Sequence, residues 1–174
     1  MSDVDLMRLS RAGEMEAFSA LVHRHQSALL NFFLRLGADA HGAEDCAQET
    51  FLRLYRCRGH YQPSAPFRSF LFTLARHSWV DWYRRAARRE AADIDRLEIC
   101  APESASGTDA RLDLRSALLT LPEHLRWVIA LSTDEGLSYA EIGAVLGIPV
   151  GTVKSRMFHA LKKLRETLHA KLAR

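Results

Sequence analysis

Residues 136–168 read GLSYAEIGAVLGIPVGTVKSRMFHALKKLRETL, a stretch that predicts two helices joined by a tight turn. Ser138 and Glu141 occupy the two positions of a capping box, so the first helix should begin directly after the serine. Gly147 can adopt the left-handed conformation that ends a helix. Pro149 cannot continue the first helix but is well suited to open another, so the second helix should run from about residue 150 through the 160s.

The second predicted helix carries an apolar stripe on one side and basic and hydroxyl side chains on the others. The stripe recurs at steps of three and four residues and comprises Val153, Met157, Ala160, Leu161, Leu164 and Leu168. A short helix, a tight turn and a longer helix with basic residues near its start are typical of the helix-turn-helix, whose second helix enters the major groove of DNA. A helical hairpin with a solvated basic face is the alternative. Gly151 favours DNA binding, because a glycine in a helix costs about 1 kcal/mol relative to alanine and would let a phosphate approach the helix start.

Charge is distributed unevenly along the 174 residues, although Lys and Arg number 24 against 21 Asp and Glu, for a formal net charge of +3. Basic residues dominate residues 79–89 and the chain from residue 151 onward, whereas acids dominate residues 90–110. The acidic stretch mixes Ala, Ser, Pro and Gly with poor periodicity, so it predicts a tether between two modules. The length allows one ordinary domain or two small ones.

Nothing in the sequence indicates a metal site, a cofactor or a membrane segment. Cys46, Cys57 and Cys100 show no CxxC spacing, so neither a disulfide framework nor a zinc module is predicted. A metal-sensing or hydrolytic domain would have to use Cys46, Cys57, His41 and His60, where a single C-x2-H pattern has no second half-site. The chain starts without a basic region followed by an apolar one, and no apolar run reaches the roughly 18 residues of a membrane span. We therefore expect a cytoplasmic protein with reduced cysteines and without cofactor or metal.

The first third of the chain predicts three helices. Apolar periodicity indicates a short helix that stops at Gly13, a second from near Glu14 to Gly37, and a third that follows Asp39. The third is acidic in its first turns and contains four neighbouring residues of mixed character, Asp45, Gln48, Glu49 and Phe51. Acids at this place can simply complement the helix dipole. They can equally form the polar rim of an apolar patch that suits a basic partner helix, and spacing alone does not separate the two interpretations.

Residues 58–66 predict a loop through their Gly, Pro and Ser content, and a long helix follows from residue 67. One stripe of that helix should face the core and consists of Phe67, Leu71, Leu74, Ser78 and Trp82. A second stripe alternates arginine with aromatic rings and consists of Arg68, Phe72, Arg76, Trp79 and Tyr83. Such a stripe can stack unpaired bases, at about 1–3 kcal/mol per base, and neutralise phosphates. In the alternative, the rings pack against the first helices and the arginines reach outward.

Four helices are expected after the tether. The leucines of residues 112–121 predict a short helix, Pro122 is suited to open another, and the helix-turn-helix completes a small C-terminal domain. Together with the helices of the N-terminal part, these elements predict an all-α fold of two small helical domains joined by a flexible acidic linker.

Three segments, in this order, resemble the small bacterial sigma factors of the extracytoplasmic-function (ECF) group of the sigma-70 family. Residues 42–56, GAEDCAQETFLRLYR, resemble the segment that binds core RNA polymerase. Residues 66–85, PFRSFLFTLARHSWVDWYRR, resemble the promoter-melting and minus-10-reading helix. Residues 121–165, LPEHLRWVIALSTDEGLSYAEIGAVLGIPVGTVKSRMFHALKKLR, resemble the minus-35-reading domain.

The resemblance implies a division of the chain and a function. A core-binding and minus-10 domain would occupy residues 1–89, an acidic linker residues 90–111, and a minus-35 domain residues 112–174. The chain would be no enzyme, but would direct RNA polymerase core to promoters and be restrained by an anti-sigma factor. The rival interpretation is a stand-alone transcription regulator that uses only the helix-turn-helix. That rival predicts specific operator footprints without polymerase, whereas a sigma factor needs core to bind its promoter specifically.

The resemblance also implies roles for individual residues. Core polymerase, through the clamp helices of its largest subunit and its flap, would be a partner, with the clamp helices facing Asp45, Gln48, Glu49 and Phe51. The melted minus-10 element would meet Tyr61, Phe67, Arg68, Arg76, His77, Trp79, Arg84 and Arg85. The minus-35 element would meet Gly151, Thr152, Lys154, Ser155, Arg156, Phe158, His159 and Lys162. His77 stands where the family most often has asparagine, and imidazole differs from an amide in hydrogen-bond geometry and titration.

Overall fold

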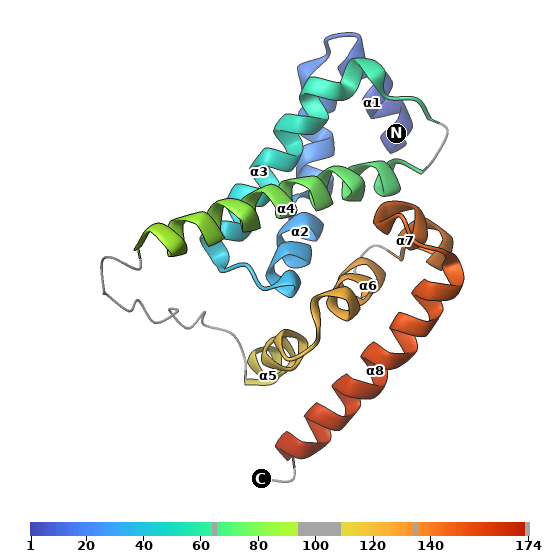
Figure 1. The fold of residues 1–174 in the computed structure, drawn as a ribbon. Helices are drawn as coiled ribbons and strands as arrows, with labels where there is room; N and C mark the ends of the chain where they lie inside the picture. The colour runs from blue at the N-terminus through green and yellow to red at the C-terminus, as the bar shows by residue number, and fades with distance from the viewer. Residues whose placement is uncertain (64–65, 94–108, 134–135, 173–174) are drawn as a thin grey trace.

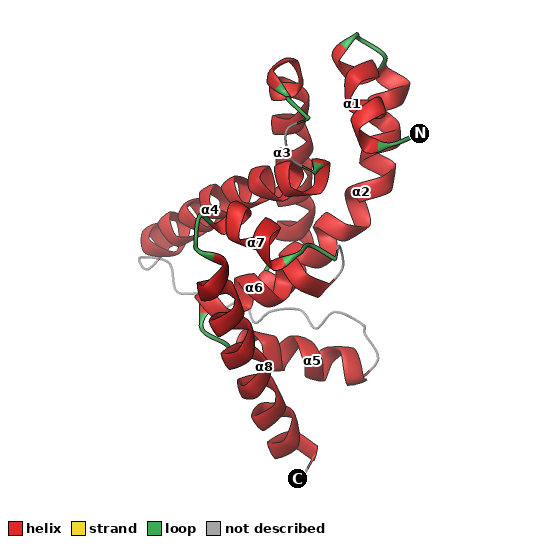
Figure 2. Ribbon diagram, turned by 90° about the vertical axis from the view of Figure 1, so that its right-hand side faces the viewer, coloured by secondary structure: helices red, strands yellow, loops and turns green. Residues whose placement is uncertain are grey.

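Helices make up all the regular structure that the computed structural model describes, which covers residues 1–63, 66–93, 109–133 and 136–172 (Figure 1). Figure 2 shows the same helices from the side, with short loops between them. The all-α prediction is therefore confirmed.

The N-terminal domain contains α1 (Asp3–Arg11), α2 (Met15–Leu36), α3 (Ala40–Cys57), the short 3-10 helix η1 (Arg58–His60) and α4 (Phe67–Asp93). The predicted starts and stops follow from local chemistry. Gly37 ends α2 with a φ of 114°, a left-handed conformation that glycine adopts without strain. Asp39 caps α3 by accepting the N–H of Gly42 at 2.7 Å. The predicted loop after α3 begins with a single 3-10 turn instead.

The core of this domain forms where α4 lies across α2 and α3 (Figure 1). Phe33 of α2 stacks on Trp79 of α4 with ring centroids 6.3 Å apart, and Trp79 stacks on Trp82 at 5.2 Å. Phe72 is also buried, at 2 % exposure, whereas Tyr83 is 57 % exposed. The aromatic rings of the second stripe therefore pack inward except at its end, as the alternative interpretation of that stripe predicted.

The C-terminal domain contains α5 (Asp109–Leu119), α6 (Glu123–Thr133), α7 (Tyr139–Leu146) and α8 (Val150–Leu172), so the four predicted helices are confirmed. The buried stripe of α8 holds Val153, Met157, Ala160 and Leu164, with Leu168 half-buried. Leu161 is 53 % exposed, so its assignment to this stripe was wrong. At about 100° per residue, position 161 lies about 80° from Val153, beyond the arc that α5 and α6 cover.

The predicted linker over residues 90–111 is helical at both ends, because α4 continues to Asp93 and α5 begins at Asp109. Alanines at positions 91 and 92 favour the extension of α4, since alanine has the highest helix propensity. The remaining part, residues 94–108, lies outside the described residues. The two domains contact each other: α2 packs against α5 and α6, and α4 packs against α7.

Candidate nucleic-acid interface

The turn between α7 and α8 has the geometry of a helix-turn-helix. Ser138 caps α7, because its Oγ accepts the N–H of Glu141 at 3.3 Å and Glu141 Oε2 accepts the N–H of Ser138 at 2.7 Å. Hydrogen bonds from the side chain and the backbone N–H of Ser138 to the carboxylate lower the pKa of Glu141. Gly147 ends α7 with a φ of 68°. Gly143 has no room for a side chain, since a Cβ there would lie 2.8 Å from the carbonyl oxygen of Ile148. The turn between the helices can therefore be tight, because Gly147 adopts the left-handed conformation and Gly143 leaves room for the backbone of Ile148.

The start of α8 forms one wall of a cleft of about 760 Å³. Six of the eight residues predicted to read the minus-35 element line this cleft, namely Gly151, Thr152, Ser155, Arg156, His159 and Lys162. Lys154 and Phe158 do not line it but are exposed on the same helix, with Phe158 at 65 %. The structure thus gathers the predicted set on one helix, most of it around one concave surface.

Sequence reasoning missed the opposite wall of the cleft, which α6 supplies. Pro122, His124 and Leu125 line it at the start of that helix, and Lys163 joins from α8. The sequence predicted a helix that opens at Pro122, but only the packing of α6 against α8 brings His124 to the cleft. The charged side chains on the lining are Arg156, Lys162 and Lys163 against the single acid Glu166. A surface of this charge suits a phosphate backbone.

Gly151 has nothing within 4 Å of the place where a Cβ would stand, and its φ is not in the left-handed region. The packing of α8 therefore does not require glycine at this position. The first turn of a helix also has backbone N–H groups without intrahelical partners, which favour anions. Both observations support the sequence-based argument that a phosphate approaches the chain here.

The residues predicted to read the minus-10 element fall into two groups by burial. Arg68, His77, Arg84 and Arg85 are exposed along α4, and Arg76 is half-buried. Tyr61, Phe67 and Trp79 are buried, at 7 %, 3 % and 4 % exposure. The exposed group can contact DNA as the structure stands, whereas the buried aromatic rings belong to the core.

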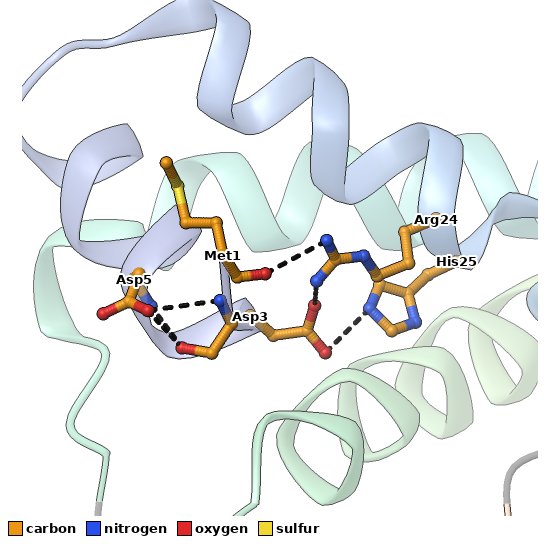
Figure 3. A network of polar contacts seen from close by, with 6 residues as sticks. Met1, Asp3, Asp5, Arg24 and His25 are labelled. Atoms are coloured by element: carbon orange, nitrogen blue, oxygen red, sulfur yellow. Dashed lines mark hydrogen bonds and ion pairs between the residues drawn. The ribbon is translucent and has the colours of Figure 1, made fainter.

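Tyr61, within the predicted loop, and Phe67, directly after it, lie near a polar network at the N-terminus. Figure 3 shows this network. Asp3 accepts a hydrogen bond from Arg24 Nη1 at 2.5 Å, and Nε2 of the buried His25 lies 3.1 Å from its other oxygen. The ring of His25 lies 5.2 Å from that of Phe67. Burial raises the pKa of Tyr61, and the negative charge of Asp3 raises it further. Asp3 of α1 is thus connected through His25 of α2 to Phe67, where the chain leaves the loop.

Three of the four residues predicted to bind core polymerase, Asp45, Gln48 and Glu49, form a ridge of α3, and Phe51 lies on an adjoining side of the helix. Asp45 and Gln48 are exposed, Glu49 is half-buried and Phe51 is buried at 8 %. Phe51 lines an apolar groove of about 500 Å³ between α2 and α3. Asp45 and Glu49 line a neighbouring polar cleft of about 440 Å³, and Gln48 lines both. The structure therefore has an apolar groove beside a polar cleft here, which fits one of the two interpretations that the sequence left open.

Glu49 also has a role inside the protein. Its Oε1 accepts a hydrogen bond from Arg53 Nε at 2.9 Å, and Arg53 Nη2 donates to Asp81 of α4 at 2.7 Å. The hydrogen bond from Arg53 lowers the pKa of Asp81. Arg53 thereby links α3 to α4, and the exposed Asp45 and Gln48 are more available to a partner than Glu49 is.

Cysteine and histidine side chains form no metal-binding cluster in the part of the chain that the structure describes. Burial raises the pKa of Cys46 to about 12, with Asp45 adding to the shift, so this thiol stays protonated and is a poor nucleophile or ligand. Within the described ranges, no helix combines the length and apolarity needed to cross a membrane.

An all-helical protein whose C-terminal domain carries a basic helix-turn-helix belongs, by fold and surface, to the class of DNA-binding transcription proteins. Comparison with known proteins identifies the family. Residues 21–89 match the family model of sigma-70 region 2, and residues 111–164 match that of sigma-70 region 4.

Relatives in sequence support the same family. The sigma-H factor of Pseudomonas aeruginosa is 32% identical over 180 residues, which cover 95% of this chain and 93% of the relative. The ECF sigma factor SigE of Mycolicibacterium smegmatis is 38% identical over 161 residues, which cover 88% of this chain but 62% of that longer relative. The chain therefore belongs to the ECF group of the sigma-70 family, whose members direct promoter-specific initiation of transcription.

Two solved structures have the same fold. CnrH, in complex with the cytosolic domain of CnrY, matches with a TM-score of 0.74 and 31% identity over 97% of both chains. The sigma factor RpoE of Bartonella quintana, in complex with the anti-sigma factor NepR, matches with a TM-score of 0.73 and 27% identity, over 87% of this chain and 96% of that one.

Proposed function

We propose that this sigma factor reads the minus-35 element with the start of α8 and the minus-10 element with α4, while α3 binds RNA polymerase core. The observation that carries the proposal is the cleft at the start of α8. Because the apolar stripe of α8 is buried, most of the residues predicted to read DNA lie on the other side of the helix and line this basic cleft. A helix-turn-helix presents its second helix to the major groove in this way.

At the minus-35 element, we assign two roles to the polar side chains of α8. Arg156 and Ser155 lie in the cleft one turn from the helix start, where side chains reach base edges. Lys162 lies two turns further on and suits a phosphate, which fixes orientation without reading sequence. His124 and Lys163 extend the same surface and join it in this proposal.

At the minus-10 element, the contacts come from the exposed cationic side of α4. Arg68, Arg84 and Arg85 would hold phosphates of the melted strand, and His77 would hydrogen-bond a base or phosphate. Tyr83 is the exposed ring on which a base can stack. The buried Trp79 would position α4 rather than touch DNA. Opening the duplex needs no hydrolysis, because capture of unstacked bases offsets a cost of a few kcal/mol per base.

Core polymerase would dock on the ridge of α3 through the clamp helices of its largest subunit, with Asp45 and Gln48 meeting basic residues and Phe51 at the floor of the apolar groove. The flap would receive the C-terminal domain. We further propose that an anti-sigma factor restrains the chain in the cytoplasm, since the structural relatives CnrH and RpoE are seen in complexes with CnrY and an anti-sigma factor.

Transcription in vitro with purified core enzyme tests the proposal. A genomic template library, core and the full chain should yield transcripts with defined start sites that share two upstream elements, and core alone should not. Specific footprints of the chain in the absence of core, with no effect on initiation, would instead identify a stand-alone regulator.

A further inference from the structure

Arg84 and Arg85 are neighbours near the end of α4, but their side chains leave the helix in different directions. Successive residues of a helix are about 100° apart. Arg84 follows His77 by seven residues, almost two full turns, so these two share a side of α4. Arg85 follows Asp81 by four residues, and Asp81 accepts a hydrogen bond from Arg53 of α3. Arg85 is therefore on the side of α4 that faces α3.

The polar cleft of about 440 Å³ beside the apolar groove lies between α3 and α4. The wall that α4 forms includes Arg85. The wall that α3 forms includes three of the residues proposed to bind core polymerase, Asp45, Gln48 and Glu49. Arg84 is exposed but does not line this cleft. Arg85 thus shares a concave surface with the proposed core-docking residues, and Arg84 does not.

Two exposed charges of opposite sign line this cleft, Asp45 and Arg85. Both act on the buried thiol of Cys46, whose pKa is raised mainly by burial and further by Asp45, whereas Arg85 lowers it. Within the described part of the chain, neither of the two forms an ion pair. Glu49, by contrast, is paired with Arg53. A partner that enters the cleft therefore meets one carboxylate and one guanidinium that have no ion-pair partner of their own.

The same cleft also has apolar surface. Leu52 of α3 is 43 % exposed there, and the half-buried Trp82 lines the side of α4. Protein interfaces commonly combine an apolar or aromatic centre with a charged rim. A phosphate backbone fits this cleft poorly, because Asp45 and Glu49 would repel it. The cleft suits a protein partner better than nucleic acid.

We propose that Arg85 is a docking residue for RNA polymerase core, which presents an acidic side chain to Arg85 and a basic one to Asp45. This inference rests on the proposed docking of core on α3, and it assigns Arg85 to polymerase instead of to the phosphates of the minus-10 element. Arg84, on the side of His77, keeps the DNA contact. The pair of opposite charges also fixes the orientation of the partner, because a reversed partner would bring like charges together.

Charge reversal at the two adjacent arginines separates polymerase binding from DNA binding. Arg85→Glu should weaken association of the full chain with core about tenfold, measured by titrating a fluorescently labelled chain with core in the absence of DNA. Arg85→Gln removes the charge without reversing it and should weaken association about two- to fivefold. Arg84→Glu is the matched control. It should leave core association unchanged but weaken binding of forked minus-10 DNA at saturating core.

Two results would overturn the inference. If Arg85→Glu associated with core normally and lost DNA affinity as Arg84→Glu does, Arg85 would be a phosphate contact. If both variants lost core association equally, the loss would reflect the net charge of the chain and not a contact in the cleft. Both positions are exposed, and circular dichroism with urea unfolding checks that each variant keeps the fold.

Asp45→Arg separates failure of this inference from failure of the proposed function. Weaker core association for Asp45→Arg, with normal association for Arg85→Glu, would overturn the inference alone. Normal association for both variants would also remove α3 as the docking surface. The double variant Asp45→Arg/Arg85→Glu gives a last check. Losses that multiply would support separate contacts with core, whereas recovery towards wild-type association would show that the two residues pair with each other and would overturn the inference.

Discussion

Gly42 of α3 lies directly against the indole ring of Trp82 on α4, and a methyl group on Gly42 would overlap that ring. Trp82 stacks on Trp79, and Trp79 stacks on Phe33 of α2. The absence of a side chain at position 42 therefore sets the spacing of three helices. The same stack fixes the direction in which the exposed cationic side of α4 points.

Gly42→Ala should destabilise the protein by about 1–2 kcal/mol, because overpacking of the Trp82 ring outweighs the gain in helix propensity. Urea unfolding followed by tryptophan fluorescence measures the change. Gly59→Ala is the control, since no atom lies within 4 Å of its would-be Cβ and its φ is ordinary. Equal stability of the two variants would contradict the role given to the contact.

Arg156→Ala should weaken binding of the minus-35 element by about tenfold or more, because a side chain that reads a base edge contributes about 1–3 kcal/mol of discrimination. Association with core polymerase should be unchanged. Competition between promoters with intact and altered minus-35 elements, in the presence of core, measures the effect. Arg165→Ala, also on α8 but off the lining of the cleft, should matter less. Loss of core binding by Arg156→Ala would contradict the assignment.

The helix boundaries could be predicted because they depend on local chemistry. Ser138 and Glu141 form the predicted capping box, and Gly37 and Gly147 adopt the predicted left-handed conformation. Such signals need no knowledge of the rest of the chain. Leu161 was wrongly predicted to be buried. Periodicity shows which side of a helix is apolar, but not how much of that side the neighbouring helices cover.

The site was predicted less completely, since it depends on which helices meet. On α4, arginine and aromatic residues alternate along one stripe, and only the packing of α2 against it decides that Phe72 and Trp79 are buried. His124 reaches the α8 cleft because α6 packs on α8, a contact that no spacing in the sequence reveals. The bonds of Arg115 and Arg126 to α2 join residues far apart in sequence and were likewise unpredictable.

Gly151→Ala should change stability and DNA binding in opposite directions. The free energy of unfolding should rise by about 0.5–1 kcal/mol, because alanine has the higher helix propensity and open space surrounds the new methyl group. Affinity for minus-35 DNA should fall, because the methyl group would stand where a phosphate approaches the start of α8. Thermal unfolding and fluorescence anisotropy with core present measure the two quantities. Unchanged DNA affinity would show that no phosphate lies close to Gly151 in the complex.

Asp3 should make the stability depend on pH. Burial raises the pKa of Asp3, but hydrogen bonds from Arg24 and His25 outweigh this effect and hold the pKa below its ordinary value of 3.8. The folded protein thus binds fewer protons than the unfolded chain, so the stabilisation is present above pH 3.8 and is lost as the pH falls through the lower folded value. Asp3→Asn should cost about 1 kcal/mol near neutral pH and less in acid.

Urea unfolding of Asp3→Asn and the wild type at a series of pH values checks this dependence. Glu16→Gln, on the exposed first turn of α2, is the control and should leave the curve nearly unchanged. A stability difference between Asp3→Asn and the wild type that persisted undiminished into acid would show that the carboxylate charge is not what stabilises the network.

Asp45→Arg should weaken association with core polymerase by at least about tenfold, because it places a cation where we propose that α3 meets a basic surface, and like charges across an interface are strongly unfavourable. Stability should change by less than about 0.5 kcal/mol, since Asp45 is exposed. Co-purification with core and the salt dependence of the complex measure the effect. Glu16→Arg supplies the same charge reversal on α2, away from the α3 ridge, and should bind core normally. If Asp45→Arg associated with core as tightly as the wild type, α3 would not be the docking surface, because a reversed charge in the interface cannot be neutral.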